Sequence, residues 1–248
     1  MRHGAWTTIA ATMIFGACGA SDESASDTPW RDRALMDLDF IYAQLGGHHP
    51  GPVDTVNPWF RDWYERGYES ARSRAQSITN YAGYYFAIQY YMVGFQDGHL
   101  GALGDYRIEA NLDRRWPGFL VEYDRGTFLV MRNNGSDPEL PPTGSRLLSC
   151  DGVPASAMAD SILQTYIGLW SVNGVRPRLA PWLFVDEGNP WLQRPESCVF
   201  ETNNGQSEWQ LDWRPIEQSS LATMLVGAAT SRKPPIGIRE FGERNWWI

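Results

Sequence analysis

The spacing of apolar side chains changes from a helical to a strand-like period at about residue 117, and this change constrains the fold more than any other feature. Before it, residues 28–94 carry aromatic and aliphatic side chains at intervals of three and four, which places them on one face of a helix. After it, short β-branched and aromatic runs alternate with turns that contain glycine. The chain is therefore predicted to be an α+β protein with helices first and β-hairpins second.

Three helices are predicted in the first region. Pro29 suits the first position of a helix, and Gly46-Gly47 is expected to end that helix. Asn57-Pro58 repeats the start signal, and a third helix is predicted from about Thr79 to Val93. We interpret the aromatic faces of these helices as core. A platform on which sugars or peptides stack is the alternative.

The second region is predicted to contain strands and hairpins. The β-rich runs, in chain order, are residues 118–124, 127–132, 146–150, 197–202 and 207–213. Turns are predicted at Arg125-Gly126, Asp151-Gly152 and Asn203-Asn204-Gly205. A short helix is expected from Pro154 to about Tyr166, whereas residues 167–196, rich in Trp and Pro, receive no assignment.

The composition fits a globular protein and argues against one class of partner. A chain of 248 residues, 43% of them hydrophobic, can bury the core of one large or two small domains. The net charge is −8 and no run of basic residues occurs, so nucleic acid is not an expected partner. His48 and His49 have no Cys or carboxylate at a zinc-binding spacing, and neither a metal nor another cofactor is expected.

The N-terminal residues are typical of an export signal. Residues 5–17 are mostly apolar and too few to span a bilayer, so residues 1–17 are predicted to be a signal peptide. Ile14-Phe-Gly-Ala-Cys18 resembles a bacterial lipobox, in which cleavage before Cys18 frees its sulfur for lipid attachment. A plain secretory signal is the alternative. The predicted product is a periplasmic or cell-envelope lipoprotein that reaches the membrane through its lipid only, with residues 18–27 as an acidic tether.

The remaining cysteines leave two alternatives. If Cys18 carries lipid, Cys150 and Cys198 remain, both in predicted strands. They could form a disulfide in an oxidising periplasm, or stay as two buried free thiols.

Two segments resemble the front half of the tail-specific (C-terminal-processing) serine peptidases, in particular the tricorn-core-like branch. Phe95-Gln-Asp-Gly-His-Leu-Gly101 follows the aromatic third helix, and residues 140–152 are similar to a strand and turn of a PDZ-like module. The resemblance covers about residues 30–248. It implies a helical domain over 28–116, a PDZ-like domain over 117–214, and a linker with the start of a truncated peptidase domain over 215–248.

The same resemblance implies a role for His99. In that branch a histidine in such a turn acts as the general base, and an imidazole with a pKa of about 6.5 can accept a serine proton at neutral pH. Asp97 and Gly98 would shape the turn. From the residues alone, a structural histidine whose turn is capped by Asp97 is the alternative. Ser231 lacks the glycine-rich turn of a nucleophile, so the nucleophile is not expected in this chain.

The expected activity is therefore hydrolysis of peptide bonds in peptides or unfolded proteins, with this chain alone inactive. The apolar end Trp246-Trp247-Ile248 is interpreted as a truncation. The main alternative is a non-catalytic lipoprotein whose PDZ-like domain binds peptides near residues 140–146. A carbohydrate-binding scaffold is a second alternative.

Overall fold

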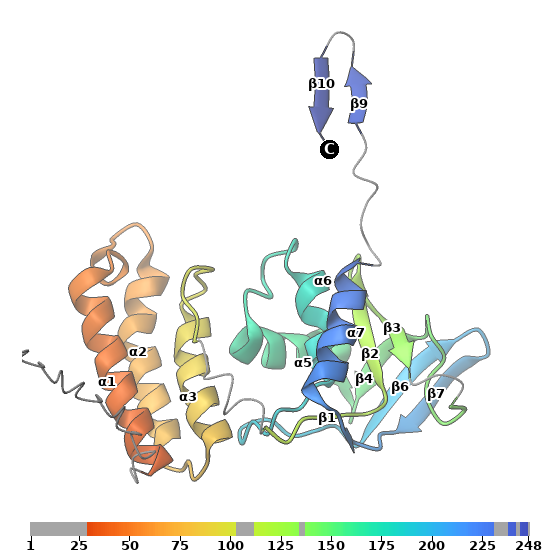
Figure 1. Ribbon diagram of the computed structural model, residues 1–248, viewed down its shortest axis with the longest axis horizontal. Helices are drawn as coiled ribbons and strands as arrows, with labels where there is room; N and C mark the ends of the chain where they lie inside the picture. The colour runs from red at the N-terminus through yellow and green to blue at the C-terminus, as the bar shows by residue number, and fades with distance from the viewer. Residues whose placement is uncertain (1–28, 103–111, 134–136, 231–237, 242–243, 248) are drawn as a thin grey trace, which may run out of the picture.

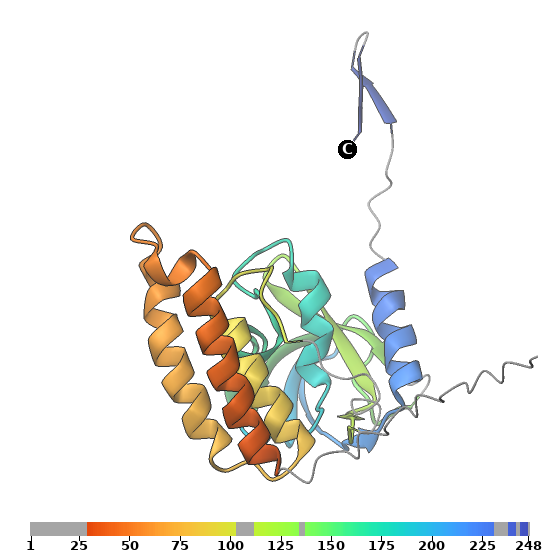
Figure 2. The same cartoon turned by 60° about the vertical axis from the view of Figure 1, so that its left-hand side comes forward.

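The computed structural model describes residues 29–102, 112–133, 137–230, 238–241 and 244–247. Helices from the first part of the chain stand side by side at one end of the molecule, and an antiparallel sheet lies at the other end (Figure 1). Short helices from residues 155–184 lie between the two, as Figure 2 also shows. The α+β fold expected from the change of period is confirmed.

The three predicted helices are α1 (Trp30–His48), α2 (Pro58–Ala75) and α3 (Tyr81–Gly94), with a 3-10 turn, η1 (Gly51–Val53), between the first two. The side chain of Asn80 caps α3 by accepting the backbone N–H of Gly83 at 2.9 Å. The first helix ends at His48, one residue beyond the predicted stop at Gly46-Gly47. Gly46 lets Tyr64 of α2 approach, since a side chain at Gly46 would overlap the Tyr64 ring.

Aromatic side chains fill the centre of this helical unit, as the sequence predicts. Tyr91 is fully buried, and its hydroxyl donates to the backbone carbonyl of Tyr64 at 3.0 Å. The indole N–H of Trp63 donates to the backbone carbonyl of Tyr91 at 2.9 Å. The polar atoms of these rings are thus satisfied inside the core, which is the condition for burying them without a large penalty.

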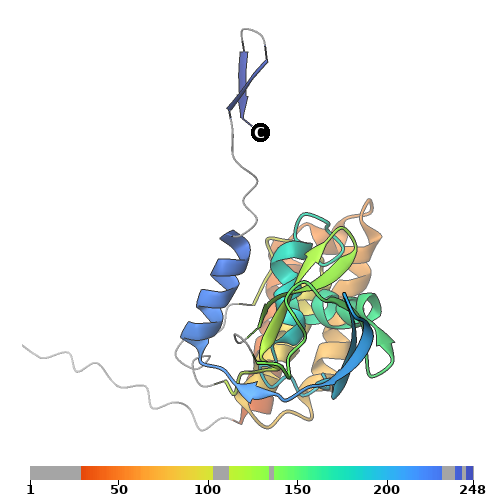
Figure 3. The ribbon, with the colours of Figure 1, turned by 90° about the vertical axis from the view of Figure 1, so that its right-hand side faces the viewer.

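The sheet has the strand order β2-β3-β4-β6-β7, with neighbouring strands antiparallel. Its members are β2 (Phe119–Asp124), β3 (Thr127–Asn133), β4 (Arg146–Cys150), β6 (Ser197–Thr202) and β7 (Gly205–Gln210), while the short β5 (Val153–Pro154) pairs with β4. Arg125-Gly126 and Asp151-Gly152 have positive φ at both residues, which tight two-residue hairpin turns require. Figure 3 shows the sheet from the side of β7.

Asp151 does more than form a turn. Its carboxylate accepts the backbone N–H groups of Glu196 and Ser197 at 3.0 and 2.9 Å. These bonds fix the start of β6 beside the end of β4, although the two segments are separated by 45 residues or more. The Asp-Gly signal therefore sets both a local turn and a long-range strand pairing.

The segment that received no assignment from the sequence covers one side of the sheet. After α5 (Ala155–Ile162), the chain forms a π-turn, η2 (Leu163–Ile167), then α6 (Arg176–Leu179) and a 3-10 turn, η3 (Ala180–Phe184). Phe184 packs on Phe119 of β2 with ring centroids 4.8 Å apart, and both are fully buried. Strand β7, at the opposite edge of the sheet, is exposed except for the partly covered Trp209.

The last part of the chain adds smaller elements. Strands β1 (Arg115–Trp116) and β8 (Arg214–Pro215) pair with each other, so the β-rich region begins at 115. They are followed by α7 (Gln218–Thr230) and by the antiparallel pair β9 (Ile238–Phe241) and β10 (Arg244–Trp247).

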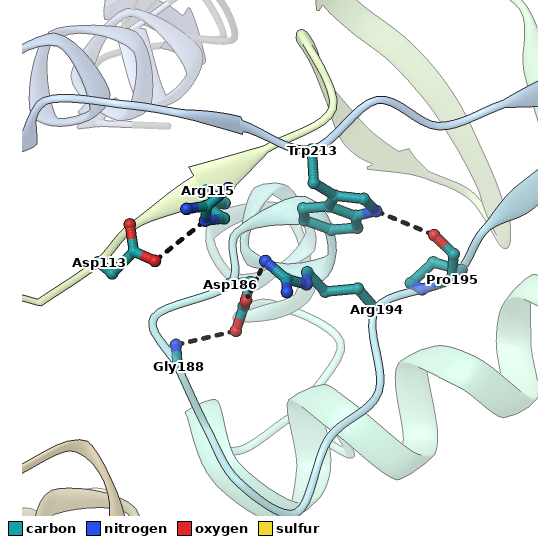
Figure 4. A network of polar contacts seen from close by, with 7 residues as sticks. All are labelled: Asp113, Arg115, Asp186, Gly188, Arg194, Pro195 and Trp213. Carbon is teal, nitrogen blue, oxygen red and sulfur yellow. Dashed lines mark hydrogen bonds and ion pairs between the residues drawn. The ribbon is translucent and has the colours of Figure 1, made fainter. Parts of the chain in front are cut away.

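The backbone of Arg115 also bridges Asp186, with N···O distances of 2.8 and 2.9 Å. Figure 4 shows the polar contacts around this bridge, including the ion pair of Asp186 with Arg194. Among the helices that the structure describes, none combines the length and hydropathy needed to cross a bilayer.

Candidate active site

His99 lies on the turn that follows α3, with 98% of its side chain exposed. The carboxylate of Asp97 accepts the backbone N–H of His99 at 2.9 Å, and the same oxygen lies 3.1 Å from the Nδ1 atom of the ring. The carboxylate therefore favours the tautomer with its proton on Nδ1, which leaves Nε2 as the proton acceptor facing solvent. This is the arrangement in which a carboxylate orients an imidazole as a general base.

The backbone N–H of His99 holds the pKa of the Asp97 carboxyl below its usual value, and the imidazole and the more distant His49 lower it further. A lowered folded pKa means that the ionised carboxylate stabilises the fold. That contribution is fully present above the usual aspartate pKa of about 4 and is lost as the pH falls through the lower folded value. The Asp97 carboxylate is therefore ionised across the pH range in which an imidazole works as a base.

This electrostatic assignment gives a direct prediction. In a carbon-detected NMR titration, the Asp97 carboxyl should titrate below the usual aspartate value in the wild-type chain. In His99→Ala its pKa should rise only part of the way back, because the backbone N–H, the largest cause, is retained. An Asp97 pKa at the usual value in both proteins would contradict the hydrogen bonding described above.

His49 shapes the neighbouring loop. Its ring stacks on Phe60 with the centroids 4.6 Å apart, and its Nδ1 accepts the backbone N–H of Gly51 at 3.0 Å. His48 is exposed at the end of α1. Within the described ranges, no three His, Cys, Asp or Glu side chains gather closely enough to hold a metal ion.

Two glutamines that the sequence did not single out as site residues are bonded to each other next to the His99 turn. Gln96 has a φ of +56°, and its side-chain carbonyl accepts a hydrogen bond from the amide of Gln164 in η2. The two residues are 68 positions apart, and nothing in the local pattern of either one indicates the contact.

Of the predicted cysteine sites, Cys150 and Cys198 are bonded to each other in the structure. They are directly opposite one another on β4 and β6, and both are buried. Of the two alternatives, the structure has the disulfide. Cys18 and Ser231 lie outside the described residues.

A groove of about 700 Å³ adjoins the segment that was predicted to bind peptides. One wall is the loop of residues 142–146, and the other is the β6–β7 hairpin with Glu201, Ser207 and Trp209. Ser207 and Trp209 belong to β7, the strand at this end of the sheet, so the groove reaches the edge strand from the side of β6.

Comparison with known proteins places the fold. No family model and no curated protein sequence matches the chain. The solved structures that match include mature CPAF, with 16% identity and a TM-score of 0.51, and mature CPAF complexed with lactacystin, with 18% identity and a TM-score of 0.54. The chain has an α+β fold similar to that of CPAF. Both likenesses cover 83% of this chain but only 38% and 39% of CPAF, so the chain spans well under half the length of that protein.

Proposed function

We propose that this protein is the base-bearing part of a serine-type peptidase of the tail-specific kind, with His99 as the general base. The observation that carries the proposal is the Asp97–His99 pair, with Nδ1 held by a carboxylate and Nε2 open to an incoming group. CPAF, a serine protease of Chlamydia with a similar fold, supports the reaction class.

In the proposed reaction Nε2 of His99 takes the proton of a serine hydroxyl as its oxygen attacks the carbonyl carbon of a peptide bond. The same nitrogen then gives the proton to the leaving amine, and water hydrolyses the resulting ester by the reverse sequence. Asp97 stabilises the imidazolium that forms between these steps. We assign no serine of this chain as the nucleophile, so the chain alone is expected to be inactive.

We also propose a role for the β-rich region and a location for the protein in the cell. Residues 117–214 would act as a PDZ-like domain that presents a peptide or an unfolded protein. The signal peptide and Cys18 would place the protein in the periplasm or cell envelope on a lipid anchor.

A second function, peptide binding without cleavage, is favoured by one specific observation. The groove beside residues 142–146 lies next to β7, and in the described part of the chain no strand pairs with the outer edge of β7. An extended peptide could add to this edge through backbone hydrogen bonds.

A fluorophosphonate probe, which reacts only with an activated serine, distinguishes the two functions. The complete gene product isolated from its source cells should be labelled covalently, His99→Ala should not be labelled, and His48→Ala should be labelled as the wild type is. Absence of labelling and of hydrolysis in a wild-type product that still binds unfolded protein would establish the binding function instead.

A further inference from the structure

We propose that Gln164 is a positioning residue for His99, acting from the β-rich region on the turn that carries the base. The inference rests on the proposed function and names a residue on which that function depends. Gln164 and Leu169 contact residues 96–98 of the turn, and neither of them lines the groove beside residues 142–146.

The turn has an unusual backbone at Gln96. A φ of +56° is uncommon for a residue other than glycine, so side-chain contacts must hold Gln96 in this conformation. Two such contacts exist. The side-chain amide of Gln96 donates to the carbonyl of Val93 at 2.8 Å, and its side-chain carbonyl accepts from the Gln164 amide. Asp97 follows directly, so the direction of its carboxylate depends on how Gln96 is held.

Gln164 is itself fixed in place. Its side-chain carbonyl accepts the backbone N–H of Ser171 at 2.7 Å, so both ends of its amide are engaged. It lies in the π-turn η2, which is anchored by Tyr166 against Phe86 and Tyr90 of α3, with ring centroids 6.2 and 5.9 Å apart. Single π-turns of this kind often occur at functional sites.

A third contact lies next to the base. The side chain of Leu169 lies beside Gly98, where an added Cβ would be 3.4 Å from a Leu169 methyl carbon. The segment 163–171 thus supports the turn at Gln96 through a hydrogen bond and at Gly98 through packing. Of these two supports, only Gln164 acts by donating a hydrogen bond. A substitution that removes this donor therefore tests the support at Gln96 by itself.

The consequence for catalysis follows from the geometry of proton transfer. A base works only within hydrogen-bond reach of the proton it takes, and a displacement of about 1 Å can lower the rate about 100-fold. Loss of the Gln164 donor should release Gln96 from its positive φ and displace Asp97 and His99. We expect kcat to fall about 100-fold while KM changes little, because Gln164 does not line the groove.

The test compares Gln164→Glu and Gln164→Ala with Gln44→Ala, which removes an exposed glutamine on α1. Gln164→Glu keeps the acceptor for Ser171 and loses the donor to Gln96, so it separates positioning from folding. The readouts are the His99 ring resonances in NMR spectra of this chain, and kcat and KM of the complete gene product. Both Gln164 variants should shift the His99 resonances and lower kcat, and Gln44→Ala should do neither.

Unchanged His99 resonances and unchanged kcat in Gln164→Glu would overturn the proposal, as would a change in KM alone. Failure of the proposed function gives a different result. The wild type would then show no hydrolysis, or His99→Ala would hydrolyse as the wild type does, even where the His99 resonances of Gln164→Glu still report the contact.

Discussion

Replacement of His99 by alanine should lower kcat/KM of the complete gene product about 1,000-fold, as measured with a fluorogenic peptide at neutral pH. A positioned general base contributes between about 100-fold and 10,000-fold, and His99 would serve twice in each turnover. Its side chain is almost fully exposed and its only described polar contact is with Asp97, so the substitution should leave the free energy of unfolding nearly unchanged.

The Asp97→Asn variant refines this prediction. Asparagine can still accept the backbone N–H of His99, but it can also donate to Nδ1 and so favour the wrong tautomer. Activity should therefore fall although the turn persists. The exposed His48 provides a matched control, since His48→Ala should retain wild-type kcat/KM. Hydrolysis by His99→Ala within tenfold of the wild type would assign the base to another residue and leave His99 a structural role.

Loss of the disulfide is the second large effect. Removing the bond between Cys150 and Cys198 releases a loop of 48 residues in the unfolded chain, which corresponds to about 4 kcal/mol of lost stability in the chain-entropy description. Both cysteines lie in the buried core between β4 and β6, so alanine at both positions adds the loss of packed sulfur atoms.

Urea unfolding measures this effect. The urea concentration at the unfolding midpoint should fall strongly when dithiothreitol is added to the wild type. The midpoint of Cys150→Ala/Cys198→Ala should be low without the reductant and should not change when it is added. A wild-type midpoint that is the same with and without dithiothreitol would show that the two thiols are not bonded in the native protein.

Local signals in the sequence were sufficient for most of the secondary structure. Asn57-Pro58 starts α2, and Arg125-Gly126 and Asp151-Gly152 form tight turns, because each signal depends on the backbone preferences of the residues themselves. The interpretation of the His99 turn came instead from the resemblance of a short motif after an aromatic helix, since the residues alone leave a structural histidine as the alternative.

Long-range contacts account for what the sequence could not predict. Gly46 lies inside α1, which ends at His48, and its lack of a side chain makes room for Tyr64 of another helix. The π-turn at 163–167 and its bond to Gln96 depend on two segments 68 positions apart. The contacts that hold the candidate base therefore depend on the tertiary structure, and neither hydrophobic periodicity nor turn motifs predict them.

The unequal edges of the sheet limit how this molecule can associate with itself. Strand β2 is packed against η3 and begins with three fully buried residues, whereas β7 presents its backbone to solvent. Two copies that meet through β7 would form a pair about a twofold axis, and that contact would occupy the outer edge of β7 in both copies. Further growth through this sheet would then require the edge of β2, whose first three residues are fully buried.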